Sequence, residues 1–316
     1  MPEIGASAVM DRKEAIPVAA NFTLAACHAF VNIYQFFILP LWLLPRDLLW
    51  AWTLAPLMLL NNPYWSLIHE AIHDLFHPQK RINIFFGRAL SVLFGSPFQI
   101  LRLSHLLHHK LNRTPVEATE IYERGKGSFF MAACGYYFQI LGGLYLVEIL
   151  SPFLFYLPSG WLEKFRSRFI KAETVSGILM QNWSRKEVTR EIRIDGLLIF
   201  VWFGAATIWY GVHWPLLIGA LAARAFLISF LDNVYHYETP LNDIFYAANL
   251  RLPRTASRLL LNFNLHGIHH QNPAIPWRSL PGIFTETAKI FQGNYLTAAA
   301  RQLRGPVAVQ DLPQSR

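Results

Sequence analysis

Long apolar stretches alternate along the chain with polar, basic segments. Residues 18–44 and 48–68 are apolar and are separated only by the sequence Pro-Arg-Asp. Residues 195–212 and 215–235 are also apolar and flank a short turn that contains Gly211. Because a membrane-spanning helix needs about 20 mostly apolar residues, each pair predicts a helical hairpin through a membrane.

The composition supports a membrane protein. Hydrophobic residues make up 53% of the chain and charged residues only 15%, whereas soluble domains carry roughly 25% charged residues. The two cysteines, Cys27 and Cys134, lie far apart in apolar surroundings and form neither a disulfide framework nor a thiolate metal motif. We therefore predict an all-α integral membrane protein, a single domain over residues 1–316 with about four transmembrane helices.

The placement of Lys and Arg predicts the orientation. With the N-terminus inside, 26 of the 28 lie in the segments that are then cytoplasmic: 1–17, 70–128, 159–194 and 237–316. Arg46 is then on the outer side and Arg224 within a span, so the positive-inside rule favours this orientation. The net charge of +8 then reflects topology and contact with anionic lipid heads, and nucleic acid is not an expected partner. The predicted layout has two transmembrane hairpins, an interfacial or re-entrant segment and a cytoplasmic helical cap in two parts: hairpins at 18–68 and 195–236, the interfacial segment at 129–194, and the cap at 69–128 and 237–316.

Nine of the 12 histidines gather beside these apolar stretches. They form three boxes and one isolated position: His69 and His73; His105, His108 and His109; His266, His269 and His270; and His236. In every box the first and last histidines are four residues apart, so both lie on one face of a helix. Uncharged imidazole is a common ligand of zinc, copper and iron. Nine imidazoles are too many for one ion, and their number predicts a site for two.

A further apolar stretch, residues 129–158, contains a single charged residue, Glu148. Two complete spans need about 40 residues, which this stretch does not provide. One span would place the third histidine box across the membrane from the first two, and no shared metal site could then form. We therefore predict that this stretch lies in the interface or enters and leaves by the same face.

The boxes resemble those of the membrane fatty acid desaturase superfamily, whose members carry one HxxxH and two HxxHH boxes around a non-haem di-iron centre. The sequence from Pro273 to Trp277, after the third box, is similar to a continuation common in acyl desaturases. The resemblance implies that all nine histidines bind two iron ions on the cytoplasmic side of the membrane. In related enzymes an asparagine four residues before the histidine matching His236 reaches a metal through water.

Three residues are candidates for supporting the predicted ligands. This chain has Asp232 at the position of that asparagine and Asn233 directly after it, so either residue is a candidate for the role. Asp232 can equally be an ordinary carboxylate at a helix end. Asn264, shortly before the third box, is a candidate hydrogen-bond partner for a ligating imidazole, as is Asn262.

The implied reaction uses O2 and two reduced iron ions to remove hydrogen from a lipid acyl chain and leave a double bond. Electrons are expected from a separate carrier such as ferredoxin, rubredoxin or cytochrome b5. Hydroxylation, carotenoid oxygenation and oxidative decarboxylation to a terminal alkene remain alternatives within the superfamily.

Two alternatives come from other classes of protein. The sequence from His69 through Glu70 to His73 has the form of a zinc-hydrolase motif, but a single zinc needs three protein ligands and leaves six histidines unexplained. A metal-binding membrane transporter should have ionisable residues spread along its spans, whereas these histidines concentrate at one end.

The remaining polar residues have plainer interpretations. Within the spans, His28 is read as structural and Arg224 as facing other helices. His213 is read as structural and His77 as a surface residue, and the chain from Gly305 onward is expected to be loose. Three carboxylates downstream of the second box are expected on a solvated helix face: Glu117, Glu120 and Glu123.

Overall fold

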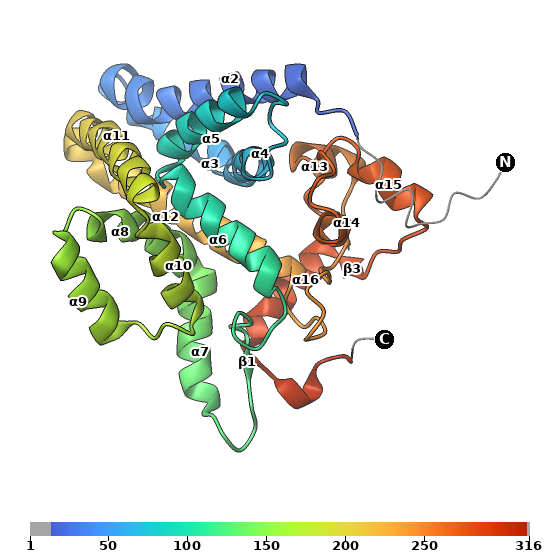
Figure 1. Ribbon diagram of the computed structural model, residues 1–316. Coiled ribbons are helices and arrows are strands. Elements are labelled where there is room, and N and C mark those ends of the chain that lie inside the picture. Colours follow the sequence, from blue (N-terminus) through green and yellow to red (C-terminus); the bar gives the residue numbers. More distant parts are fainter. Residues whose placement is uncertain (1–13, 315–316) are drawn as a thin grey trace.

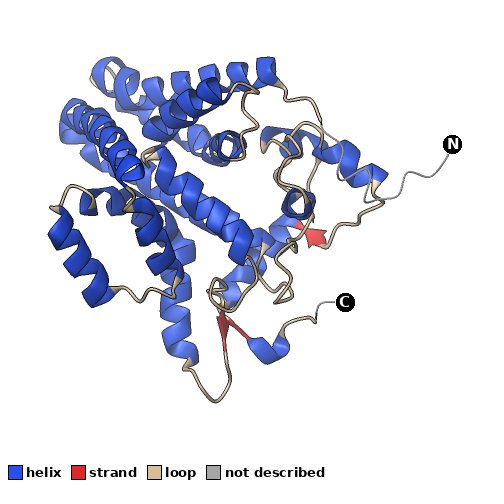
Figure 2. Ribbon diagram, in the orientation of Figure 1, coloured by secondary structure: helices blue, strands red, loops and turns tan. Residues whose placement is uncertain are grey.

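The computed structural model describes residues 14–314, and the regular elements of this part are helices apart from four two-residue strands (Figure 2). Three helical segments are long and apolar enough to cross a membrane, and a bent helix pair would add a fourth: Val18–Leu43, Phe129–Leu154, Lys186–Tyr235, and Lys80–Phe94 with Phe98–Leu111. The predicted class, an all-α integral membrane protein, is confirmed.

The first predicted hairpin begins with one long helical segment, α2 (Val18–Ile33) continued by the π-helix η1 (Tyr34–Leu43). The second predicted span, 48–68, is not one straight helix. It consists of three pieces: η2 (Leu48–Thr53), α3 (Leu54–Met58) and α4 (Asn61–Ile72). The break before α4 follows from its sequence Asn-Asn-Pro, because asparagine and proline disfavour helix interiors and suit helix starts.

Helix α4 is followed by α5 (Lys80–Phe94) and α6 (Phe98–Leu111), which are bent by 102° relative to each other. The bend occurs at Gly95, whose φ of +105° is a conformation that favours glycine. Helix α5 packs against α2 and α4, and α6 packs against α4 (Figure 1).

The second predicted hairpin forms as α11 (Lys186–Tyr210) and α12 (Trp214–Asp232), joined through η4 (Gly211–His213). The two helices pack against each other, and α12 is followed by η5 (Asn233–Tyr235) (Figure 1). An ion pair between Asp195 of α11 and Arg88 of α5, 2.6 Å long, ties this hairpin to the N-terminal helices.

The apolar stretch from residue 129 forms α7 (Phe129–Phe138), η3 (Gln139–Gly143) and α8 (Leu144–Leu154). Gly142 interrupts the helix with a φ of +128°, and its Cα lies against Ala225, so that η3 packs closely on α12. Length and composition would allow this segment to cross a membrane. Its interfacial or re-entrant placement stays a prediction.

Two short helices, α9 (Ser159–Phe169) and α10 (Val175–Trp183), lead from this segment to α11. They form an arm beside α7 and α8 (Figure 1). Helix α10 also packs against α6.

The C-terminal part wraps around the ends of α4 and α6. Its elements are short helices and two-residue strands: β2 (Leu250–Arg251), α13 (Arg254–Leu259), α14 (His266–Gln271), α15 (Leu280–Glu286), β3 (Gly293–Asn294), α16 (Tyr295–Arg301), η6 (Gln302–Arg304), β4 (Val307–Ala308) and η7 (Val309–Asp311). Strand β2 pairs in parallel with β3.

The expectation of a loose tail after Gly305 is wrong. Strand β4 pairs in parallel with β1 (Ile121–Tyr122), and the amide of Val307 donates a hydrogen bond to the carbonyl of Glu120. The Tyr237 hydroxyl donates to the carbonyl of Gly305. The tail is therefore a strap that fastens the segment after the second histidine box.

The span helices are joined by a buried cation. The Arg224 side chain donates to the Asn61 side-chain oxygen at 2.7 Å, the Asn32 side-chain oxygen at 3.1 Å and the Phe94 carbonyl at 2.9 Å. Arg224 thus faces other helices, as predicted. His28 stacks on Tyr64 with 4.7 Å between ring centroids, in keeping with a structural role.

We expect Arg224→Met to destabilise the protein, because buried polar groups on α2, α4 and α5 would lose their donor. The expected loss is about 2–4 kcal/mol in the free energy of unfolding. Thermal unfolding in detergent micelles measures it, with Arg254→Met, at an exposed position, as the control. An unchanged midpoint for Arg224→Met would contradict the structural role.

Candidate metal centre

The three histidine boxes meet where α4, α6 and α14 end (Figure 1). Box 1 lies at the C-terminal end of α4, which stops because Asp74 adopts a positive φ of 61°. Box 2 occupies the last two turns of α6, and box 3 forms most of α14. His236 follows η5 directly and reaches the same place.

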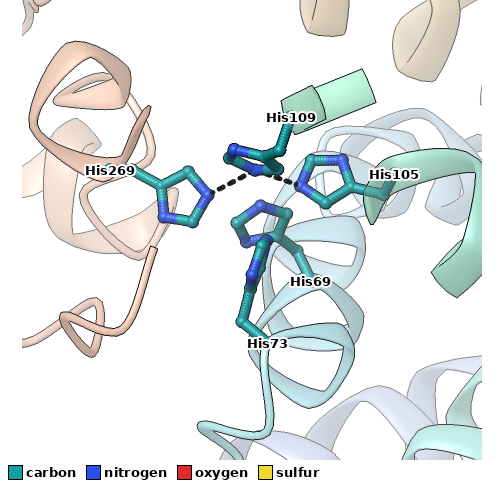
Figure 3. Close-up of side chains that lie close together, drawn as sticks. All are labelled: His69, His73, His105, His109 and His269. Carbon is teal, nitrogen blue, oxygen red and sulfur yellow. Dashed lines mark hydrogen bonds between the residues drawn. The ribbon is translucent and has the colours of Figure 1, made fainter. Parts of the chain in front are cut away.

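The nine predicted ligands separate into two groups, and in each group the candidate ligand atoms all lie within 4.8 Å of one another. The first group contains five histidines: His69, His73, His105, His109 and His269 (Figure 3). The second group contains four: His108, His236, His266 and His270.

The HxxHH spacing explains this division. In box 2 the outer histidines, His105 and His109, join the first group and His108 joins the second. In box 3 the outer pair joins the second group and His269 joins the first. Residues four apart share a helix face, whereas adjacent residues point about 100° apart. Each box therefore contributes to both groups.

The ring nitrogens face one another at short distances. The Nε2 atoms of His269 and His109 are 3.1 Å apart, and those of His109 and His105 are 3.0 Å apart (Figure 3). In the second group the Nε2 atoms of His270 and His266 are 3.1 Å apart.

Several other ring nitrogens are buried without a hydrogen-bond partner among the described residues: Nε2 of His69, Nε2 of His73, Nδ1 of His236 and Nδ1 of His266. A neutral imidazole carries only one N–H, so such clusters bring lone pairs together. This donor set fits two cations.

The electrostatics keep the imidazoles in the form that binds metal. Burial, followed by repulsion from neighbouring imidazoles, holds the pKa values of His69, His266 and His269 well below the usual range. Neutral histidine has a lone pair to donate. These imidazoles therefore favour the neutral form, whose lone pair can coordinate metal.

A cavity of about 520 Å³ lies beside the second group. Its walls come from α6, α7, η3, α8, α10 and the end of α12, and His105, His108 and His236 line it. Apolar side chains make up much of the remaining wall, including Leu101, Phe138, Leu144, Val147 and Leu179. Its lining residues extend from these histidines to Gly135 of α7 and Ser151 of α8.

Two side chains that the sequence did not single out as ligand partners support the histidines. The Glu117 carboxylate lies 2.8 Å from Nδ1 of His108, and the Asn112 side-chain nitrogen lies 3.2 Å from Nδ1 of His270. A carboxylate on Nδ1 fixes the tautomer and leaves Nε2 free for a metal. Glu117 was expected on a solvated face, and no spacing rule connects it to His108.

The three predicted supporting residues have different surroundings. Asp232 lines the cavity and accepts a hydrogen bond from the Trp65 indole at 3.1 Å. Asn233 also lines the cavity, but its amide donates to the Gln302 side chain at 2.6 Å. The hydrogen bonds of Asn264 go elsewhere: its amide donates to the Leu250 carbonyl and its oxygen accepts from a serine hydroxyl.

Asn262 likewise serves the loop around the third box. Its amide donates to the carbonyl of Trp277 at 3.0 Å, and its oxygen accepts from the Ser257 hydroxyl at 2.9 Å. Asn262 and Asn264 thus shape the segment that leads into α14. The described hydrogen bonds of both residues connect them to groups other than an imidazole.

The comparison with known families agrees with this geometry. Residues 47–300 match the family model described as fatty acid desaturase, and this range includes all three boxes and His236. The chain belongs to the fatty acid desaturase family. No curated protein matches the sequence.

Membership gives this desaturase-family protein a coarse function. The family is one of oxidoreductases that act on lipid acyl chains and use iron. The helical segments and the family together make it an integral membrane protein. The two histidine groups are able to hold metal ions.

Glu70, within the first box of this family member, has a structural partner. Its carboxyl accepts a hydrogen bond from the Trp277 amide at 3.2 Å, and burial raises its pKa to about 8. The Trp277 indole in turn donates to Asn21 at 2.9 Å. Glu70 therefore fastens the segment after the third box to α4, and the feature that suggested a zinc hydrolase has another explanation.

The prediction that Glu120 lies on a solvated face is wrong. Its side chain is 2% exposed and forms an ion pair with Arg113, which is also buried. Arg113 donates as well to the carbonyls of Thr239 and Pro240, which precede the third box. Glu123 is exposed, as predicted, and pairs with Lys126 at 2.8 Å.

His77 was predicted to be a surface residue, and the structure shows it half-buried. Its Nδ1 accepts a hydrogen bond from the amide of Gln79 at 2.9 Å. It belongs to neither metal group.

We expect Glu117→Ala to weaken metal binding about 10–100-fold, because His108 loses the carboxylate that orients it. Glu117→Gln should keep most of the affinity, since its amide oxygen still accepts from Nδ1–H. Competition with a chelator of known affinity measures the change. Equal metal retention in both variants and the unchanged protein would contradict this role.

We expect Glu70→Gln to preserve metal content and activity, because the amide oxygen still accepts from the Trp277 amide. Glu70→Leu should lose about 1–3 kcal/mol of stability by leaving that amide without an acceptor. Thermal unfolding and product formation are the measurements. An inactive but stable Glu70→Gln protein would instead indicate acid–base chemistry at this carboxyl.

Proposed function

We propose that this protein is an O2-dependent di-iron desaturase that introduces a double bond into a lipid acyl chain. One observation carries the proposal: two adjacent groups of imidazoles, most of them buried, border a cavity whose walls are largely apolar. An imidazole-rich site suits iron, and the cavity suits a hydrocarbon chain.

In this proposal each group of histidines holds one ion. The five histidines around His269 would bind the first ion and the four around His266 the second. When bound, the iron pair supplies the redox chemistry with O2 that removes hydrogen from an unactivated methylene, which zinc, having no redox chemistry, does not provide.

The protein's own residues position the substrate and exclude water. His108 and His236 belong to the second group and line the cavity, so a lipid acyl chain lying in the cavity would pass directly beside that group. Apolar walls stabilise methylene groups by burial and keep bulk water from the reacting carbons. Glu117 and Asn112 hold two ligating imidazoles in orientation.

The proposed site faces the cytoplasm, and electrons come from a separate protein or domain such as ferredoxin, rubredoxin or cytochrome b5. The distribution of basic residues supports this orientation. Lys110, directly after His109, is exposed, and so is Arg278, directly after Trp277. A negatively charged electron donor would be attracted to such a surface.

The histidine groups have to share one side of the membrane, and the contact between His109 and His269 meets this condition. Between box 2 and box 3, the hairpin of α11 and α12 would cross the membrane twice. The segment 129–158 must then contribute none or two, which supports its proposed interfacial or re-entrant placement.

We expect the purified protein to contain two iron ions per chain and to convert an acyl lipid into a product with a new double bond. His105→Ala and His266→Ala, one in each group, should each lower the iron content and abolish the product. His77→Ala, outside both groups, is the matched control. Metal analysis and mass spectrometry of lipids and headspace after expression in a bacterial host are the measurements.

The outcomes separate the alternatives. A hydroxylated lipid or a terminal alkene one carbon shorter would place the protein elsewhere in the superfamily. Active protein with a lone zinc, or activity that survives both substitutions, would overturn the di-iron proposal.

A further inference from the structure

Glu148 is the only charged residue in the apolar stretch 129–158, and it lies on α8 within a candidate membrane span. It lines the cavity together with Ser151, one helical turn later, and with Leu144, one turn earlier. An ionisable residue at such a position is costly in a membrane and is usually found where it has a functional partner.

Four carboxylates line the cavity, and three of them have partners in the protein. Glu117 contacts His108, Asp232 accepts from the Trp65 indole, and Glu120 pairs with Arg113: the relevant separations are 2.8, 3.1 and 2.5 Å.

The fourth carboxylate, that of Glu148, forms no hydrogen bond or ion pair with any other residue in the described range 14–314. Only its main-chain carbonyl is engaged, by the hydroxyls of Ser96 and Ser151. The side chain is half-buried and lines the cavity. A molecule that occupies the cavity can therefore donate a hydrogen bond to this carboxyl and, by displacing water, becomes its partner.

The charge of the cavity argues against an anionic ligand near this position. Arg113 is the only lysine or arginine among the lining residues. Its three guanidinium nitrogens donate to Glu120 and to the carbonyls of Thr239 and Pro240, so the cation is already occupied. A fatty-acid carboxylate or a phosphate close to Glu148 would therefore meet a carboxyl group, and Arg113 is not free to pair with it.

We propose that the cavity binds an alkyl lipid that carries a hydrogen-bond donor, a hydroxyl or an ammonium group, and that the Glu148 carboxyl recognises this donor. The inference rests on the proposed function in that the same lipid is taken to be the substrate. Leu144, Val147 and Phe138 offer apolar contacts to its chain.

The position of Glu148 also relates the donor to the reacting carbons. Glu148 lines the same cavity as His108 and His236 of the second histidine group. In the proposal, a lipid whose donor is held by Glu148 has its adjoining methylenes in the cavity that these histidines border. Glu148 is in this view a specificity-determining residue and acts on the substrate, not on the metal.

The test measures binding without turnover, on purified iron-loaded protein kept anaerobic and without a reductant. Hexadecanol, hexadecylamine, hexadecanoate and hexadecane compete with radiolabelled hexadecanol in mixed micelles. These ligands share a chain and differ only in the terminal group. We expect the alcohol or the amine to bind at least about tenfold more tightly than the carboxylate or the alkane.

Two variants assign the preference to Glu148. Glu148→Leu should weaken binding of the donor-bearing ligand about tenfold or more and leave hexadecane unaffected. Glu148→Gln, which is nearly the same shape, should keep binding of the alcohol but lose binding of the amine, and this difference identifies which donor the carboxyl takes. Glu173→Gln, an exposed carboxylate close to α10, should bind all four ligands as the unchanged protein does.

Equal affinity for the four ligands, or unchanged affinities in both Glu148 variants, would overturn the inference. Iron content and unfolding temperature of each variant show whether the fold is intact, and Glu148→Ala takes the place of Glu148→Leu if the latter does not fold. Failure of the proposed function has a different signature, because absent iron or absent product would leave the ligand preference measurable.

Discussion

The structure depends on one electrostatic constraint, the gathering of nine imidazoles, six of them buried, with ring nitrogens facing one another. Nε2 atoms at 3.0–3.1 Å in both groups cannot all be satisfied by the few N–H groups that neutral rings provide. Cations relieve that conflict, and the surrounding fold has to hold the rings in place until they do. The rings lie at the C-terminal ends of α4 and α6 and on the short helix α14. Contacts elsewhere must therefore fix the positions of these three helices.

Those contacts are mostly buried polar links between segments far apart in sequence. Arg224 joins the hairpin of α11 and α12 to three N-terminal helices, and Glu70 joins box 1 to the segment after box 3. Arg113 connects the segment after box 2 to the carbonyls that precede box 3. In apolar surroundings such links are strong when complete and expensive when broken. Several of the same helices also line the cavity, which explains why the histidine groups and the cavity are neighbours.

The cavity differs from a plain hydrocarbon sleeve in its charge. Three of its carboxylates are neutralised or hydrogen-bonded by the protein, and the only lining arginine is fully engaged. What remains is a largely apolar space in which Glu148 is the one lining carboxylate without a partner among the described residues. Burial of methylenes is non-directional and gives affinity without fixing a register along the chain. A single polar contact can fix that register, which is the property a regioselective enzyme needs.

The sequence by itself determined the all-α membrane class, the hairpin at Gly211 and the nine clustered histidines, because each rests on local spacing along a span or a helix. It did not determine how the histidines divide into five and four, since this depends on how three helix ends are turned toward one another. It also missed the partners of Glu117 and Glu120, the ordered strap after Gly305 and the break before Asn61. The first three are contacts between segments with no shared periodicity, so only the tertiary structure brings them together. Glu148 shows both sides: its isolation in an apolar stretch was visible in the sequence, but the cavity it faces was not.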